Sequence, residues 1–390
     1  MSVSHLFSEE VRRNPYPEYE RLRRESPLCR DPGSGHWMIF DYAGVRRVLT
    51  DFETFSSKHG PADWMIFTDP PRHTRLRGLV SKAFTPRSIA NLEPRIAVLS
   101  RELIDQQIER GEMDLVADFS AALPLRVIGD MLGIPPAGRA RFGRWNDAIL
   151  NMSYAVVGSP DASAVFHEFL VVTDEMGEYL AELLARRKAE PQDDLLTRLA
   201  SAELDGERLT PGDILGFFQL LLLAGSETTT NLINIAILCL IEHPAERRRL
   251  AENPELLPAA IEEVLRYRSP LQWMFRLARR DVELHGQTVR TGQLVLAMMG
   301  SANRDPAQFP DPERFDIGRD PNPHLAFGLG NHFCLGAPLA RLEARIALGQ
   351  LLNRLQNLEL ASTTPWAPRK GLHVHGPSQL PIRFEPGALK

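Results

Sequence analysis

One cysteine stands in a context typical of a metal-binding thiolate. Cys334 lies in the segment Phe-Gly-Leu-Gly-Asn-His-Phe-Cys-Leu-Gly at residues 327–336, directly before a strongly helical stretch. The thiolate is the form of cysteine that binds metals, and it persists where the surroundings are positive. The free N–H groups and the dipole of a helix N-terminus supply such surroundings, and glycines let backbone amides approach the sulfur. The pattern favours a metal-ligating thiolate over a buried structural thiol, the usual state of a lone cysteine.

A second candidate site interrupts the most apolar stretch of the chain, residues 214–241. Four leucines precede a short polar insertion there, composed of Ala224, Gly225, Ser226, Glu227 and Thr228. Glycine, an acid and hydroxyl residues are poor helix formers in so apolar a setting, and such a local break is typical of a site. A threonine hydroxyl bonds to carbonyls of the preceding turn, which bends a helix or admits water. We expect a long core helix with a functional interruption, because an acid in mid-membrane would be costly.

The composition limits the class of protein. The chain has 390 residues, 43% hydrophobic and 24% charged, which is ordinary for a globular protein. Its formal net charge of -5 argues against a nucleic-acid binder. Since no flexible linker, low-complexity tract or repeat is visible, we predict a single domain over residues 1–390.

The cysteines and the N-terminus bear on the compartment. Cys29, Cys239 and Cys334 are odd in number and far apart, so they predict neither a disulfide framework nor a zinc site, and a reducing cytoplasm is expected. The first residues contain no apolar segment, so we expect no secretion signal and no membrane anchor.

Hydrophobic periodicity predicts mainly helices with a few strands. The predicted helices span 17–25, 88–110, 164–188, 213–242, 257–268 and 338–355. The predicted strands span 36–40, 282–284, 293–297 and 379–384. A proline-rich irregular loop over 305–323 is expected to lead towards Cys334. The fold class is therefore mainly α with minor β.

The segment around Cys334 resembles the haem-ligating signature of the cytochrome P450 superfamily, Phe-x-x-Gly-x-(Arg/His)-x-Cys-x-Gly. Its fixed positions are filled by Phe327, Gly330, His332, Cys334 and Gly336. The resemblance implies that Cys334 is the axial ligand of haem b, iron protoporphyrin IX. It also implies the cytochrome P450 fold, in which a long central helix lies over the haem beside small β-sheets.

Other motifs follow in the family's order, over nearly the whole chain. Glu263 and Arg266 are three residues apart on a predicted helix and share one face. A lone pair of this kind is usually a solvated surface pair. Because a Pro-Glu-Arg-Phe segment follows at 312–315, the resemblance implies a buried network of Glu263, Arg266 and Arg314 that holds the loop before Cys334.

The family carries (Ala/Gly)-Gly-x-(Asp/Glu)-Thr at the kink of its central helix. The resemblance therefore implies that Ala224 and Gly225 lie beside the haem. It also implies that Glu227 and Thr228 relay the protons that dioxygen activation consumes.

Haem propionates in an apolar pocket need cationic or hydrogen-bonding partners. The resemblance points to four residues, although a surface cation is the default interpretation of each one alone: His73, Arg77, Arg276 and His332.

The resemblance implies a haem-thiolate monooxygenase that inserts one oxygen atom of O2 into a C–H bond of a largely apolar small molecule. Separate redox partners, a ferredoxin and its NAD(P)H-dependent reductase, are expected because the sequence shows no flavin or iron–sulfur motif. Arg341 and Arg345 share one helical face after Cys334, and we hypothesise that they help to dock an acidic partner. The segments expected to line the substrate pocket are rich in aromatic and apolar residues: 62–67, 217–225, 271–275 and 372–374.

Three alternatives stay open. A peroxygenase commonly replaces the acid–alcohol pair, so Glu227 and Thr228 count against it. A cytochrome P450 that desaturates or couples its substrate is compatible with every motif above. A haem-binding sensor without turnover belongs to another class of function, and an intact relay motif argues against it.

Overall fold

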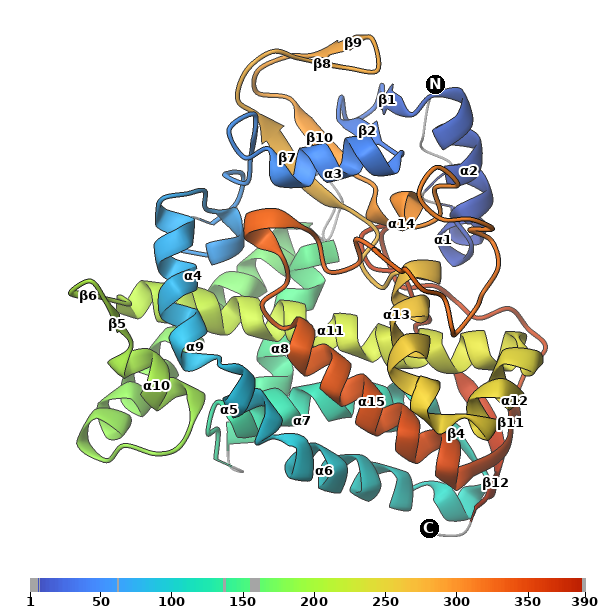
Figure 1. Ribbon diagram of the computed structural model, residues 1–390. Coiled ribbons are helices and arrows are strands. Elements are labelled where there is room, and N and C mark those ends of the chain that lie inside the picture. Colours follow the sequence, from blue (N-terminus) through green and yellow to red (C-terminus); the bar gives the residue numbers. More distant parts are fainter. Residues whose placement is uncertain (1–5, 7, 62, 136–137, 155–161, 388–390) are drawn as a thin grey trace. The chain divides into compact units, whose positions relative to one another are not determined.

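The computed structural model describes residues 6, 8–61, 63–135, 138–154 and 162–387. Helices dominate, and the strands form small sheets (Figure 1). The chain divides into two compact units: the first comprises residues 1–59, 96–123 and 228–390, and the second comprises 60–95 and 124–227. The prediction of a single domain over 1–390 stays a prediction.

The first unit holds the Cys334 loop and the helices on either side of it in the chain, α14 (Met299–Ala302) and α15 (Ala337–Arg354), among others. Its other helices are α1 (Glu9–Arg13), α2 (Tyr16–Glu25), α3 (Tyr42–Thr50), most of α6 (Glu93–Asp105), α12 (Pro244–Glu252) and α13 (Leu257–Tyr267). Single turns lie at η3 (Ile108–Arg110), η4 (Leu115–Ser120), η6 (Pro254–Leu256) and η7 (Gly330–His332).

A five-stranded sheet in the first unit has the order β1-β2-β10-β7-β3. Its strands are β1 (Leu28–Arg30), β2 (Trp37–Ile39), β3 (Phe55–Ser56), β7 (Met274–Ala278) and β10 (Leu294–Ala297). The α3 residues Val45, Val48 and Leu49 belong to the same buried apolar cluster as the sheet residues Ile39 and Val295. Burial of this apolar stripe is what fixes α3 against the sheet.

Smaller sheets complete the first unit. A three-stranded sheet has the order β11-β12-β4, with β4 (Glu112–Asp114), β11 (Leu355–Leu360) and β12 (Pro381–Pro386). The hairpin of β8 (Val282–Leu284) and β9 (Gln287–Val289) turns at His285 and Gly286, whose φ angles of 46° and 71° are both positive. Two consecutive positive φ angles are the geometry of a type I′ turn, which suits the twist of a two-residue hairpin.

The second unit is helical apart from a short β-ribbon. Its elements are η2 (Met65–Phe67), α4 (Arg72–Ala83), α5 (Pro86–Ala90), most of α7 (Ala122–Met131), α8 (Arg139–Tyr154), α9 (Ala162–Ala189), α10 (Leu195–Ser201), β5 (Glu203–Leu204) and β6 (Glu207–Arg208). Trp145 of α8 is fully buried, with its ring 5.3 Å from Tyr179 and 6.3 Å from Phe218. These edge-on aromatic contacts fix α8 and α9 against Phe218, which lies in the part of the longest helix that belongs to this unit.

The longest helix, α11 (Pro211–Glu242), begins as the sequence predicts and runs through the polar insertion without a break. Thr210 and Asp213 cap it reciprocally, since each accepts the other's backbone N–H. The Ser226 hydroxyl donates to the Leu222 carbonyl 2.7 Å away, so a back-bond to the preceding turn accommodates one polar side chain. Among the described residues α11 alone is long and apolar enough to cross a membrane, but 67% of its most apolar window is buried, as in a core helix.

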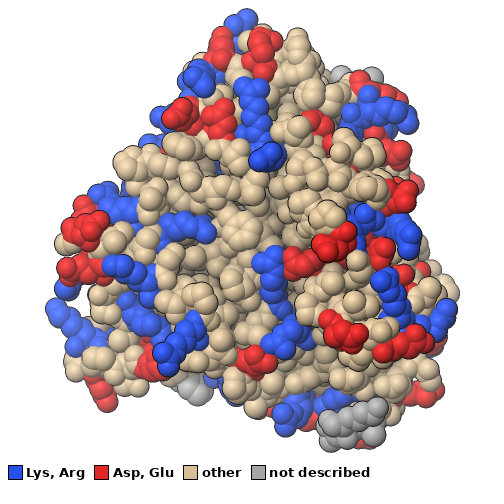
Figure 2. Space-filling view, in the orientation of Figure 1, with Lys and Arg blue, Asp and Glu red and all other residues tan. Residues whose placement is uncertain are grey.

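Most predicted elements are confirmed, but the single helix over 88–110 is wrong. The structure has α5, a turn at Asn91 and Leu92, α6 and then η3. Pro94 explains the break, because it cannot donate a hydrogen bond from a helix interior and is accommodated in the first turn of α6. Acidic and basic side chains intersperse on the face shown in Figure 2, in keeping with the small net charge.

Candidate active site

The loop before α15 holds Cys334 by its backbone. The Cys334 amide donates to the Phe327 carbonyl at 2.8 Å, and the Phe333 amide donates to the Gly330 carbonyl at 3.0 Å. Helix α15 starts three residues later, at Ala337. Cys29 and Cys239 are buried, whereas Cys334 is partly exposed. The thiol nearest to a helix N-terminus is therefore also the most accessible of the three.

Two glycines of the loop have structural reasons. Gly330 has φ of 73°, so any other residue there would be strained, although a side-chain carbon would meet the Thr50 backbone of α3 only at an ordinary contact distance of 3.4 Å. A side-chain carbon at Gly336 would lie 3.9 Å from the Cys334 sulfur. A glycine at this position therefore leaves the sulfur without that contact.

A continuous path links the Cys334 loop to strand β7. The Ser57 hydroxyl lies 3.0 Å from His332 Nε2. Ser57 directly follows β3, and β3 pairs with β7 through Ser56 and Leu277. Arg276 of β7 is buried, 3% exposed, and its guanidinium donates to the Phe275 carbonyl at 2.9 Å. Two predicted propionate residues, His332 and Arg276, thus belong to one connected part of the first unit.

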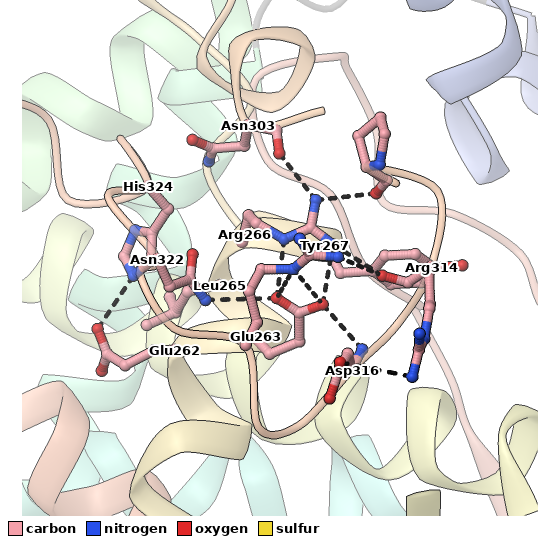
Figure 3. Close-up of polar contacts among 12 residues, drawn as sticks. Glu262, Glu263, Leu265, Arg266, Tyr267, Asn303, Arg314, Asp316, Asn322 and His324 are labelled. Atoms are coloured by element: carbon pink, nitrogen blue, oxygen red, sulfur yellow. Dashed lines mark hydrogen bonds and ion pairs between the residues drawn. The ribbon is translucent and has the colours of Figure 1, made fainter. Parts of the chain in front are cut away.

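Glu263 and Arg266 of α13 form a fully buried ion pair, with two nitrogen–oxygen distances of 2.8 and 2.9 Å (Figure 3). The Arg266 guanidinium also donates to three backbone carbonyls of the segment that leads to Cys334. These acceptors are Asn303 at 3.0 Å, Pro312 at 2.9 Å and Arg314 at 3.1 Å. The planar fork of arginine satisfies all these acceptors at once, and this fixes the segment on α13.

The predicted role of the Arg314 side chain is wrong. Only the Arg314 carbonyl joins the network, and its side chain is 64% exposed, with its guanidinium 3.6 Å from Asp316. Arg319 reaches Glu263 instead, at 3.3 Å, and Asn322 donates to the same carboxylate at 3.3 Å. The network uses only the backbone carbonyl of Arg314, which any residue type would supply. Arg319 and Asn322 lie outside the Pro-Glu-Arg-Phe motif, so the motif gave no signal for them.

Arg341 of α15 has a partner within the first unit. Its guanidinium donates to both carboxylate oxygens of Glu262 at 2.7 Å, and it lies 4.5 Å from the centre of the Phe327 ring. His324 is 3.0 Å from the same carboxylate. Although burial opposes the shift, hydrogen bonds from Arg341 and His324 lower the pKa of Glu262 to about 2. This cluster ties α13, α15 and the Cys334 loop together.

The polar insertion of α11 has an open side and a buried side. Ala224 is exposed, and Thr228, one turn further, is partly exposed. Glu227 is 4% exposed, so its carboxyl is buried. Gly225 lies where a side-chain carbon would meet Ile128 of α7 at 2.9 Å, so glycine permits close packing.

The remaining predicted residues lie in the second unit. His73 and Arg77 are both on α4, separated by one helical turn; His73 is buried and Arg77 is partly exposed. Arg72 and Arg75 of the same helix form surface ion pairs with Asp213 and Glu207, as expected of solvated cations. Trp64 donates to Gln219 at 2.9 Å within this unit. Ala62, from the same predicted pocket segment, lies outside the described residues.

Comparison with known proteins identifies the family. The family model of cytochrome P450 matches residues 41–378. A putative cytochrome P450, YjiB of Bacillus subtilis, is 42% identical over 358 residues, 90% of each chain. The structure of CYP109Q5 from Chondromyces apiculatus superposes with a TM-score of 0.91, at 39% identity over 98% of both chains. The structure of CYP109E1 from Bacillus megaterium in complex with corticosterone has a TM-score of 0.89, at 40% identity over 96% of this chain and 99% of that one.

The chain therefore belongs to the cytochrome P450 family, and it has the cytochrome P450 fold. It is a haem-thiolate monooxygenase that uses O2 and electrons from redox partners. Among the described residues no cluster of three or more His, Cys, Asp or Glu side chains is placed to hold a metal ion.

Proposed function

We propose that this enzyme hydroxylates a C–H bond of a largely apolar small molecule, with Cys334 as the axial ligand of haem b. The observation that supports this most is the partly exposed Cys334 sulfur, which lies before α15 in a loop held by the Cys334–Phe327 backbone bond. The bound haem would supply O2 activation and two-electron oxidation of the substrate. The glycine at 336 fits a planar group at this sulfur.

Four side chains are proposed to hold the haem propionates: Arg276 and His332 of the first unit, and His73 and Arg77 of the second. Buried Arg276 supports this, because a guanidinium removed from water favours an anionic partner. Phe327, Gly330, Gly336, Ala224 and Gly225 are proposed to line the cofactor.

Thr228 and Glu227 are proposed to deliver protons. Thr228 is partly exposed on the open side of α11, where its hydroxyl can donate to a bound ligand. Glu227 is buried next to it and can pass a proton to the hydroxyl. Burial of the acid limits free entry of water, which would divert the oxidant.

The proposed redox partners are a ferredoxin and an NAD(P)H-dependent reductase. The proposed compartment is the cytoplasm, and three free cysteines in the described chain support a reducing environment. The proposed apolar substrate has support from Trp273, Met274 and Phe275, which are consecutive, apolar and partly exposed. The corticosterone complex of the Bacillus megaterium relative also favours an apolar ligand.

The decisive test is the absorption spectrum of the reduced protein with carbon monoxide. We expect the red-shifted band of a thiolate-ligated haem, and we expect Cys334→Ala to lose it. Cys29→Ala is the matched control, because Cys29 is a buried thiol of β1, and it should keep the band. A Cys334→Ala protein that retains the band would refute the proposed ligand.

The relay is tested by coupling of NADH consumption to product. Thr228→Ala should divert electrons to hydrogen peroxide, because the hydroxyl that donates the proton is gone. Thr228→Ser keeps a hydroxyl and should stay coupled. Equal coupling in wild type and Thr228→Ala would remove Thr228 from the relay.

A further inference from the structure

Two neighbouring aromatic rings of the first unit each carry a buried ring nitrogen without a hydrogen-bond partner. These nitrogens are Nε1 of Trp273 and Nε2 of His373, and neither finds a partner among the described residues. The two rings are 4.4 Å apart between centres and inclined at 46°. An unpaired buried donor or acceptor is costly, so two of them on neighbouring rings indicate a missing partner.

The backbone holds this pair in place. Leu271 and Val374 form an antiparallel bridge, and the Gln272 amide donates to the His373 carbonyl at 2.8 Å. On its other side, Trp273 packs against the buried apolar cluster that includes Leu6, Tyr16 and Leu372. The main chain that carries the two rings is therefore fixed, while each ring can still rotate about its side-chain bonds.

The pair offers one donor and one acceptor. An indole N–H only donates. Burial lowers the pKa of His373 to about 4, while a hydrogen bond to the Trp273 backbone opposes the shift. The imidazole is thus neutral at pH 7. Because the backbone bond favours the protonated ring, the backbone atom must accept a hydrogen from the ring and is therefore a carbonyl oxygen. Since Nε2 has no partner, we assign that bond to Nδ1–H, which leaves a lone pair on Nε2.

The chain segment that carries Trp273 is connected to the Cys334 loop through strand pairing and one hydrogen bond. Trp273 directly precedes β7, and Phe275 continues the same aromatic surface with its ring 5.7 Å from Trp273. Strand β7 joins the loop through β3, Ser57 and His332. Both rings are partly exposed although their nitrogens are covered, so a ligand on this surface meets the ring edges and needs a small ring rotation to reach the nitrogens.

We propose that Trp273 and His373 bind a hydroxyl group of an otherwise apolar substrate. The Trp273 N–H donates to the hydroxyl oxygen, and the hydroxyl hydrogen is donated to His373 Nε2. A hydroxyl is the smallest group that both accepts and donates, whereas an ether or a ketone leaves the imidazole unpaired. This inference rests on the proposed oxidation of apolar molecules, and it narrows the substrates to apolar alcohols.

The test is equilibrium dialysis of the haem-loaded enzyme with three matched sets of probes: a steroid, a monocyclic terpene and a twelve-carbon chain. Each set contains the alcohol, its methyl ether and the parent hydrocarbon. We expect at least one alcohol to bind about tenfold more tightly than its ether. His373→Phe and Trp273→Phe should reduce this preference to below about threefold, because both keep an aromatic ring but lose the hydrogen-bonding nitrogen.

His373→Gln keeps an acceptor oxygen and should keep part of the preference, which separates hydrogen bonding from a general disturbance of the fold. Trp366→Phe, a tryptophan outside the pair, is the control and should behave as the wild type. No alcohol preference in the wild type, no alcohol binding at all, or a preference that survives in both phenylalanine variants would overturn the inference. The carbon monoxide band is measured independently of ligand binding. A wild-type protein without this band would refute the proposed function, whereas a wild-type protein with the band but without an alcohol preference would refute this inference alone.

Discussion

Replacing Arg266 by lysine tests whether its forked guanidinium holds the segment before Cys334. Arg266 donates five hydrogen bonds, two to Glu263 and three to backbone carbonyls. A lysine ammonium keeps the positive charge beside Glu263 but has only three donors, so at least two of the five buried hydrogen bonds are lost. At about 1–3 kcal/mol for each, the free energy of unfolding should fall by about 4 kcal/mol. That is a large part of the roughly 5–15 kcal/mol of a typical protein.

The assay is urea unfolding followed by far-ultraviolet circular dichroism, with haem content as a second readout. Arg266→Lys should unfold at a lower urea concentration and retain less haem. Arg314→Ala is the matched control, because Arg314 gives the network only its carbonyl and its side chain is exposed. An unchanged midpoint for Arg266→Lys, or an equal loss in Arg314→Ala, would refute the reasoning.

Two further predictions concern Glu343, which is buried, and Glu262, which is partly exposed. Burial raises the pKa of Glu343 to about 8 from 4.5, so the folded protein keeps a proton that the unfolded chain loses between these values, and stability declines as the pH rises through this window. In Glu343→Gln the urea midpoint should therefore depend less on pH between pH 5 and 8 than in the wild type. A decline of the midpoint as steep as that of the wild type would contradict this. The pKa of Glu262 is lowered, so its stabilisation is present above pH 4.5 and is lost as the pH falls towards 2. Glu262→Gln should therefore lose less stability than the wild type over that range, by about 1 kcal/mol because Arg341 is partly exposed, and 1 M salt should shrink the difference.

The sequence predicted an element well where the residues of that element alone form a clear amphipathic pattern. The apolar periodicity of α13 and the alternation of β8 lie within a residue of their predicted positions, because each buries one face within a single local pattern. The glycine spacing also located the Cys334 loop. Helix α3 escaped prediction although Asp41 caps it, because the segment is short and its stripe is recognisable only against the sheet that it covers.

Long-range polar contacts were the part that sequence patterns could not supply. Arg319 and Asn322 reach Glu263 across more than fifty residues of chain, and their spacing follows no periodicity. The Trp273–His373 pair depends on a bridge between segments a hundred residues apart. Such pairs arise from tertiary packing, which local spacing does not encode.

The three carbonyls that Arg266 binds have a consequence for sequence change. Every amino acid carries a backbone carbonyl, proline included, so Arg266 recognises the path of the main chain at residues 303, 312 and 314 and ignores which side chains sit there. Substitutions at Pro312 and Arg314 should thus be accepted freely as long as the backbone keeps its course, whereas an insertion or deletion between 303 and 312 would shift the carbonyls of 312 and 314 relative to that of 303. The segment from 303 to 314 should therefore tolerate substitutions but not insertions or deletions.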